Sequence, residues 1–334
     1  MAYDPNVLRR ATEALEEQRR ANQTNRARLR ADTYRRQPRL EQLDRQLQGT
    51  MAQLMAAALR RGESTRDAVQ AIRQDNLSIQ AERKKLLTEL NLSPDALEGT
   101  PLCPHCGDSG WKGVQMCSCL KKLYTQEQIA ELSKLLDLGS QSFDTFRLDY
   151  YDREFWSDLN RSPREHMERV LTLCRNYAEH FGTVGRKNLF LTGNPGLGKT
   201  FLSACIARVV SERGYSVVYD TAANIFSRFE TRKFARDAEE IRQAEADARR
   251  YLTCDLLILD DLGSEFTTPF IQAALYEVIN TRLVEGKHTV ISSNLDMNAI
   301  RQRYTPQVAS RLEGEYQILP FVGQDIRLLK KQRG

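Results

Sequence analysis

The chain has 334 residues, of which 41% are hydrophobic and 28% charged, a composition typical of a folded protein with more than one domain. No apolar run approaches the roughly 18 to 20 residues that a bilayer span requires, and the charged N-terminal segment lacks the features of a secretory signal, so we expect a cytoplasmic protein that does not span a membrane. The net charge of +5 is too small, at this length, to indicate nucleic-acid binding by itself.

The first predicted domain is a helical extension, residues 1–98. Apolar residues recur every three or four positions over 40–58, which indicates a long amphipathic helix that is interrupted at residues 61–62. The sequence of 64–67 resembles a capping box and predicts the start of a second helix, which ends before Pro94. The helices would form an antiparallel, coiled-coil-like hairpin with little core of its own.

A basic stripe lies within this extension. Between residues 21 and 40 the chain has one acid, Asp32, and six arginines: Arg26, Arg28, Arg30, Arg35, Arg36 and Arg39. The stripe is either a solvated helix face or a surface for phosphate contacts.

Residues 99–125 are predicted to form a zinc knuckle. Their four cysteines follow a C-x2-C, ten residues, C-x-C pattern: Cys103, Cys106, Cys117 and Cys119. Four thiolates at this spacing can close a tetrahedral shell around Zn²⁺, and a closed shell indicates a structural role. Iron–sulfur ligation and free thiols are the alternatives, and His105 could replace one cysteine as a ligand.

Residues 126–186 are predicted to be a helical linker, and residues 187–334 to be a separate core. In this core helical stretches alternate with four short apolar runs: 189–192, 216–219, 256–259 and 289–292. Such alternation is typical of an α/β fold with a buried parallel sheet and crossover helices.

A glycine-rich loop follows the first apolar run directly and leads into a helix-like run that starts at Phe201. The loop residues are Gly193, Asn194, Pro195, Gly196, Leu197, Gly198, Lys199 and Thr200. The glycines allow the backbone to turn and to aim its amides at a chain of phosphates. Lys199 would reach the β- and γ-phosphates, and the Thr200 hydroxyl would ligate Mg²⁺. We therefore expect an ATP site that includes Phe201.

Polar residues follow two further apolar runs. Asp260 and Asp261 come after 256–259, and ligands of open α/β sheets bind at such strand ends. We expect Asp260 to hold magnesium through water, and Asp261 to orient or deprotonate the attacking water. Asn294 ends the next strand and could contact the γ-phosphate or that water, although asparagine at this place is also a common turn residue.

Two arginines near the C-terminus are further candidates. Arg311 offers a fixed positive charge to a phosphoryl-transfer transition state, supplied by a neighbouring subunit, with a surface salt bridge as the alternative. Arg327 could contact nucleotide bound to its own chain.

In combination, these motifs resemble the DnaC/DnaI-type bacterial helicase loaders, AAA+ proteins related to the IstB-type transposition helpers. The likeness covers residues 100–330 and rests on the two cysteine segments, SFDTFRLDYY, GNPGLGKT, LLILDDLGSE, TVISSN, VASRLEG and GQDIR. By this resemblance the glycine loop looks like Walker A, Asp260–Asp261 like Walker B, Asn294 like sensor one, Arg311 like the arginine finger and Arg327 like a sensor-two arginine. It implies a P-loop AAA+ core with a five-stranded parallel sheet, in which the Asn294 strand lies between the P-loop and Asp260 strands.

The resemblance also implies a function in DNA replication: ATP hydrolysis, contact with single-stranded DNA and the replicative DNA helicase, and a homo-oligomer formed with ATP. Asp261 stands where many AAA+ proteins have glutamate, so we expect weak or partner-stimulated hydrolysis. DNA could be contacted by the arginine stripe or by loops such as 224–237. An IstB-like transposition helper and a non-hydrolysing, nucleotide-bound adaptor are the alternative functions.

Overall fold

The computed structural model describes residues 3–59, 65–183 and 188–333. These residues form two compact units, Glu13–Leu120 and a larger unit of Met1–Thr12 with Lys121–Gly334. The predicted interruption at residues 61–62, the predicted cap Ser64 and the predicted boundary at Lys187 lie outside the described residues. No helix in the described part of the chain is long and apolar enough to cross a membrane.

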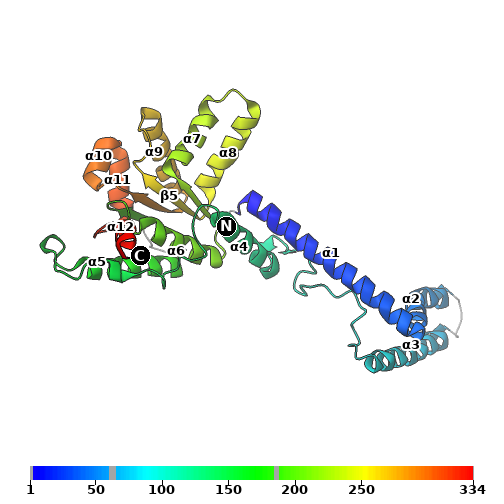
Figure 1. Ribbon diagram of the computed structural model, residues 1–334. Helices are drawn as coiled ribbons and strands as arrows, with labels where there is room; N and C mark the ends of the chain where they lie inside the picture. The colour runs from blue at the N-terminus through cyan, green and yellow to red at the C-terminus, as the bar shows by residue number, and fades with distance from the viewer. Residues whose placement is uncertain (1–2, 60–64, 184–187, 334) are drawn as a thin grey trace. The chain divides into compact units, whose positions relative to one another are not determined.

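The larger unit is built on a five-stranded parallel sheet (Figure 1). The strands are β3 (Asn188–Thr192), β4 (Val217–Thr221), β5 (Leu256–Leu262), β6 (His288–Ser293) and β7 (Tyr316–Pro320). Their order is β4-β5-β6-β3-β7, so β6 lies between β3 and β5. The predicted fold class and this strand position are confirmed.

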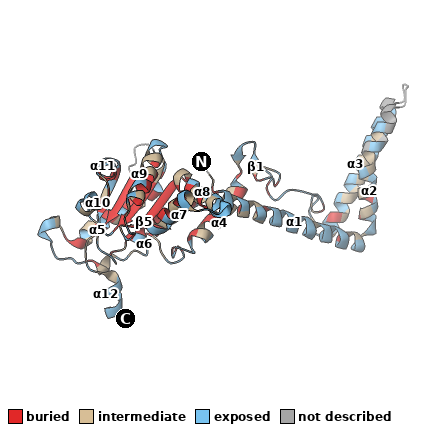
Figure 2. Ribbon diagram, turned by 90° about the horizontal axis from the view of Figure 1, so that it is seen from above, coloured by how far each residue is buried: buried red, intermediate tan, exposed pale blue. Residues whose placement is uncertain are grey.

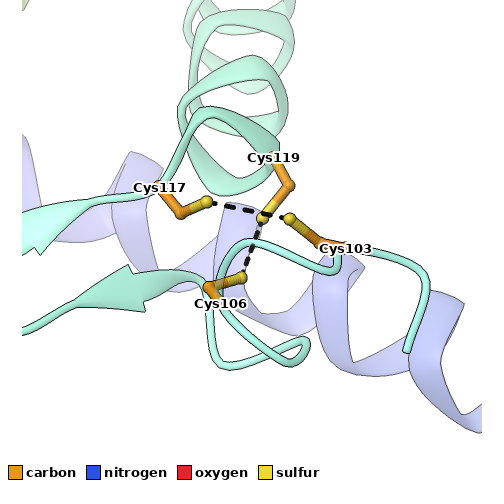
Figure 3. Close-up of side chains that lie close together, drawn as sticks. All are labelled: Cys103, Cys106, Cys117 and Cys119. Carbon is orange, nitrogen blue, oxygen red and sulfur yellow. Dashed lines mark hydrogen bonds between the residues drawn. The ribbon is translucent and has the colours of Figure 1, made fainter. Parts of the chain in front are cut away.

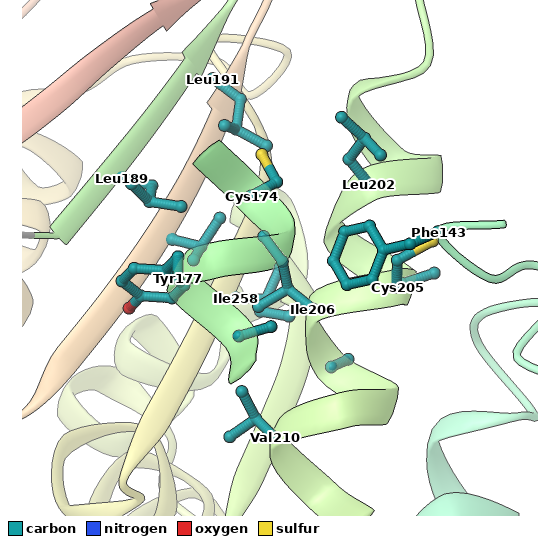
Figure 4. Packing of buried hydrophobic residues seen from close by; sticks show 14 of the residues in the cluster. Phe143, Cys174, Tyr177, Leu189, Leu191, Leu202, Cys205, Ile206, Val210 and Ile258 are labelled. Carbon is teal, nitrogen blue, oxygen red and sulfur yellow. The ribbon is translucent and has the colours of Figure 1, made fainter. Parts of the chain in front are cut away.

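Helices cover both faces of the sheet, because successive strand residues point to opposite sides. In β5, Leu256 and Ile258 pack into one hydrophobic core with α5 and α6, whereas Leu257 and Leu259 pack into a second core with α7, α8, α9 and α11. The strands are therefore the most buried part of this unit, as Figure 2 shows, and Figure 4 shows the core on the α5 and α6 side. The helices of this unit are α4 (Ser118–Leu132), α5 (Pro163–Glu179), α6 (Lys199–Glu212), α7 (Ala222–Phe234), α8 (Ala238–Thr253), α9 (Pro269–Val284), α10 (Met297–Arg303), α11 (Pro306–Glu315) and α12 (Ile326–Arg333), with short 3-10 turns at Leu148–Tyr150 and Ser157–Leu159.

One edge of the sheet differs from what the apolar runs predict, because it is formed by the additional strand β7. The edge strand β7 is absent from the four predicted runs, because only two of its residues, Tyr316 and Leu319, are buried and it ends in Pro320, a residue that sheets tolerate at an edge. At the opposite edge, the Gln128 side chain of α4 donates to the Tyr215 carbonyl (2.8 Å) and accepts from the Val217 amide (3.0 Å). This side chain satisfies backbone groups that an edge strand would otherwise leave open.

The smaller unit contains α1 from Glu13 onward, α2 (Pro38–Leu59), α3 (Thr65–Glu89) and the cysteine-rich segment. The first helix, α1 (Pro5–Arg36), ends before Pro38, and the helix predicted from the periodicity over 40–58 is the separate helix α2. The break arises because proline has no amide donor and disfavours the helical conformation of the residue before it.

Helices α2 and α3 form the antiparallel pair that the sequence predicts. Asp44 is paired with Arg83 (2.6 Å), and Thr50, further along α2, donates to Asn76, which lies earlier in α3 (2.9 Å). The apolar contact at the base of the pair is small and includes Leu40 and Leu87.

Candidate functional site

A cavity of about 700 Å³ opens at the C-terminal ends of the strands in the larger unit. Ligand sites of open parallel sheets lie at this edge. Its lining consists of Gln141, Thr145, Phe146, Arg147, Tyr150, Pro195, Gly196, Gly198, Lys199, Thr200, Phe201, Thr221, Asp260, Asp261, Ser292, Asn294, Ile326, Arg327 and Lys330. Residues from the glycine loop, the acid pair, the Asn294 strand and the C-terminal helix are thus brought together.

The glycine loop connects β3 to α6 and lies against the segment that follows β7. At Gly193 (φ +141°) a Cβ atom would lie 2.3 Å from the Phe321 carbonyl oxygen, and at Gly196 (φ +79°) it would lie 1.9 Å from Asp325 Oδ1. The Ile326 amide also donates to the Gly196 carbonyl (3.0 Å). Only glycine fits these two positions, and the close contact holds the start of α12 beside the loop.

The ammonium of Lys199 is held inside the cavity wall. Its Nζ donates to the carbonyls of Gly193 (2.5 Å) and Asn194 (2.9 Å) and to Asn294 Oδ1 (2.7 Å). Burial lowers the pKa of Lys199 to about 8, although the charges of Asp260 and Asp261 act in the opposite direction. A buried cation without a direct anionic partner is suited to receive an anionic ligand.

Asp260 accepts hydrogen bonds on both carboxylate oxygens. Thr200 Oγ1 (3.1 Å) and the Tyr219 hydroxyl (2.8 Å) donate to Oδ2, and the Ser292 hydroxyl donates to Oδ1. The carboxylate is thereby fixed beside Thr200, the other predicted magnesium ligand. Oxygen donors of this kind, a carboxylate and a hydroxyl, suit Mg²⁺.

Asp261 lies at an irregularity in the pairing of β5 with β6, and its φ of +57° is left-handed. Its amide donates to Ser292 Oγ (3.0 Å), and its Oδ1 accepts from Asn294 Nδ2 (2.8 Å). Asn294 therefore joins Lys199 to Asp261 through the two ends of its amide group. A carboxylate and an amide in these positions can orient a water molecule.

The two predicted arginines occupy different surroundings. Arg327, on α12, lines the cavity and helps to lower the pKa of Lys199 through its positive charge. Arg311, on α11, is exposed and donates to Asn280 Oδ1 (3.1 Å). Within the described part of the chain, Arg311 is not among the residues that line the cavity.

The segment 141–150 and Lys330 line the cavity but were not among the predicted site residues. Phe146 is stacked on Tyr151 with ring centroids 5.9 Å apart, and the guanidinium of Arg147 lies 5.1 Å from the ring centroid of Tyr150. The available signal was the run SFDTFRLDYY, which carries the resemblance without specifying a role for each residue.

The four cysteines of the smaller unit converge on one point (Figure 3). Cys103 Sγ lies 3.8 Å from Cys117 Sγ, Cys106 Sγ lies 3.5 Å from Cys119 Sγ, and all four sulfurs are within 4.8 Å of one another. In a tetrahedral zinc site with Zn–S bonds of about 2.3 Å, sulfurs lie about 3.8 Å apart. The group therefore fits a metal ion of this size, whereas His105 is exposed and is not part of it.

The strand, glycine loop, helix and acid pair around one cavity define the larger unit as a P-loop ATP-binding unit of the AAA+ class. Residues 179–331 match the model of the IstB-like ATP binding proteins. These residues are therefore similar to an IstB-like ATP-binding domain, in line with the resemblance that the motifs indicate.

The relatives in sequence include two replicative helicase loaders. DnaI of Bacillus subtilis is 28% identical over 144 residues, which cover 41% of this chain and 42% of DnaI. DnaC of Escherichia coli K12 is 25% identical over 144 residues, which cover 43% of this chain and 56% of DnaC. The chain spans about half the length of the curated relatives it matches.

Two solved structures are also similar to this chain. The structure of DnaI gives a TM-score of 0.42 at 20% identity and covers 57% of this chain and 92% of that one. The structure of the DnaC helicase loader gives a TM-score of 0.41 at 21% identity and covers 54% of this chain and 98% of that one.

Proposed function

We propose that the protein is an ATP-dependent, helicase-loader-like ATPase that acts in DNA replication. The observation that supports this most directly is the arrangement around the cavity. Lys199 from the glycine loop and the pair Asp260–Asp261 from another strand face one space, and Asn294 bonds to both sides of it. A triphosphate needs a cation and backbone amides on one side and a magnesium ligand on the other.

In this proposal the amides of the glycine loop and Lys199 bind the phosphates. Thr200 and Asp260 would hold Mg²⁺, which neutralises phosphate charge when it is bound. The aromatic and cationic residues of 141–150, with Arg327 and Lys330, would surround the rest of the nucleotide, because planar rings and guanidinium groups stack on a base.

For hydrolysis, we propose that Asp261 orients or deprotonates the attacking water and that Asn294 positions Asp261. Arg311 would act on the nucleotide of a neighbouring copy, because it is exposed on α11 and does not line its own cavity. This requires a homo-oligomer that forms with ATP.

We infer the partners, single-stranded DNA and the replicative helicase, from the relatives that are named as helicase loaders. In the arginine stripe, four of the six side chains bind groups of the same unit: Arg26 and Arg30 to carbonyls near the end of the extension, Arg35 to Asp32, and Arg39 to Glu82. These contacts favour a structural role for much of the stripe.

Residues 224–237, which are expected from the sequence to form a loop, lie mostly in α7 and offer a mixed surface for a nucleic-acid strand. Phe226 and Phe229 are buried in the core, so they do not line a channel. Lys233 and Phe234 are exposed, and the Lys233 ammonium lies 5.9 Å from the ring centroid of Phe234. We propose this exposed end of α7 as the better candidate for DNA contact, since stacking and positive charge bind single strands.

The experiment is to measure ATP turnover by the full chain, alone, with single-stranded DNA, and with the host's replicative helicase. The proposal expects turnover that increases with these partners, and expects the helicase to co-purify with the protein in the presence of ATP. Tight ATP binding without turnover under any condition would support the non-hydrolysing adaptor instead. The IstB-like family match favours the transposition helper as second candidate, which predicts co-purification of a transposase.

We also propose that the cysteine cluster holds one structural Zn²⁺. The donor set and the spacing of its sulfurs support this, and a closed shell of four sulfurs leaves no position for a substrate. Metal analysis of protein purified without chelator should give about one zinc per chain.

A further inference from the structure

Ser292 is a buried serine in β6 that bonds to both members of the acid pair. Its hydroxyl donates to Asp260 Oδ1, and its oxygen accepts the amide hydrogen of Asp261 at 3.0 Å. The side chain is 1% exposed and sits at the irregularity where β5 leaves regular pairing with β6. Among the described residues, Ser292 is the one whose side chain forms hydrogen bonds with both acids.

The two contacts have different physical effects. The hydroxyl proton fixes the rotation of the Asp260 carboxylate, whose other oxygen is fixed by Tyr219 (2.8 Å). The contact with the Asp261 amide stabilises a left-handed backbone (φ +57°), which is unfavourable for a residue with a side chain. That backbone directs the Asp261 carboxylate to Asn294.

We propose that Ser292 is a positioning residue that sets the magnesium-side and the water-side carboxylate together, with Tyr219 as the second support of Asp260. This inference rests on the proposed function, because it concerns how the same cavity responds to Mg²⁺. A freely rotating Asp260 would hold the metal less tightly, since the carboxylate would lose its orientation on binding.

The neighbouring Ser293 is a matched control. It lies in the same strand and is 0% exposed, but its hydroxyl donates to the Leu262 carbonyl (2.6 Å) and accepts from the Leu295 amide (3.0 Å). Ser293→Ala therefore removes a buried hydroxyl of the same kind but no hydrogen bond to Asp260 or Asp261. A general loss of packing would affect both serine variants alike.

The test is a Mg²⁺ titration of the binding of a fluorescent ATP analogue to full-length wild type, Ser292→Ala, Tyr219→Phe and Ser293→Ala. Without metal, all four proteins should bind the analogue with affinities within about twofold. Ser292→Ala and Tyr219→Phe should need about tenfold more Mg²⁺ than the wild type to reach half of the Mg²⁺-induced change in affinity, as expected for a lost hydrogen bond to a charged acceptor. Ser293→Ala should respond as the wild type does.

Measurements of ATP turnover distinguish the role of Ser292 from that of Tyr219. At saturating Mg²⁺, Ser292→Ala should still lower kcat, because the Asp261 amide has lost its acceptor, whereas Tyr219→Phe should recover the wild-type kcat. If Ser292→Ala fails to fold by circular dichroism, Tyr219→Phe, which keeps its buried ring, still tests the metal response.

The outcomes distinguish this inference from the proposed function. If the wild type responds to Mg²⁺ and both Ser292→Ala and Tyr219→Phe respond at the same Mg²⁺ concentration as the wild type, the inference alone is overturned. An equal shift in Ser292→Ala and Ser293→Ala overturns it as well. A wild-type protein whose nucleotide affinity ignores Mg²⁺ overturns both.

Discussion

Nucleotide binding is predicted to draw a proton from solution onto Lys199. Burial lowers the pKa of this ammonium to about 8 in the free protein. Phosphate groups beside the ammonium favour its charged form, so the pKa should rise again when nucleotide is bound. Lys199 is therefore expected to be partly neutral before binding and fully charged afterwards.

The size and sign of this effect follow from the pKa. With a pKa of about 8 in the free protein and full protonation in the complex, uptake is about 0.1 proton at pH 7, about 0.5 at pH 8 and about 0.9 at pH 9. The ordinary pKa of lysine is 10.5, so the unfolded chain binds more protons than the free native protein between about pH 8 and 10.5. The free protein therefore gains stability from this group as the pH rises through that window.

Calorimetric titration with ATP in two buffers of different ionisation enthalpy gives the number of protons taken up at each pH. At pH 8 and above the phosphates of the ligand have already lost their protons, so the signal belongs to the protein. Lys199→Arg is the control, because its guanidinium stays charged and should take up no proton. Uptake near zero at pH 9 in the wild type, or equal uptake in Lys199→Arg, would refute the reasoning.

Arg311→Ala should leave nucleotide affinity unchanged and abolish the hydrolysis that depends on assembly, since Arg311 is exposed outside the cavity; turnover equal to wild type at high protein concentration would contradict its role. Cys103→Ser should reduce zinc from about one per chain to a small fraction, as measured by metal analysis, and unchanged zinc would count against a four-sulfur shell. Gly196→Ala should weaken ATP binding and lower the free energy of unfolding by about 1–3 kcal/mol, because its φ is +79° and the added Cβ would meet Asp325. Gly314→Ala, whose Cβ meets no atom within 4 Å, is the control and should be neutral or stabilising in thermal unfolding.

The parts of the site that could be predicted are encoded by residues next to one another. The glycine loop lies between an apolar run and a helix-like run, and Asp260 and Asp261 follow an apolar run directly. Parallel strands end at one edge of a sheet, so these residues and Asn294 meet at the same place. The arrangement of the cavity followed from local patterns and one rule of topology.

The parts that could not be predicted depend on contacts between distant segments. Ser292 and Tyr219 lie within apolar runs and resemble ordinary strand residues, and their contact with Asp260 exists only because β4 and β6 flank β5. The segment 141–150 has no pattern of a binding loop, and it lines the cavity because the chain returns to the glycine loop, where the Tyr151 hydroxyl bonds to the Leu197 carbonyl (2.7 Å).

In the helical extension, the sequence pattern leaves the start of the predicted helix undefined. The apolar periodicity over 40–58 indicates a helix but does not mark the residue at which it begins. The structure ends α1 at Arg36 and starts α2 at Pro38, because proline fits the first position of a helix and not its interior.

The central claim is that one triphosphate binds where Lys199 faces Asp260 and Asp261. Equilibrium titration of the full chain with ATP and Mg²⁺ tests it most directly, with Lys199→Ala compared after circular dichroism has shown that its fold is intact. We predict one ATP site per chain in the wild type and no measurable binding in the variant. A wild type that binds no adenine nucleotide, or a variant that binds it equally well, would contradict the claim.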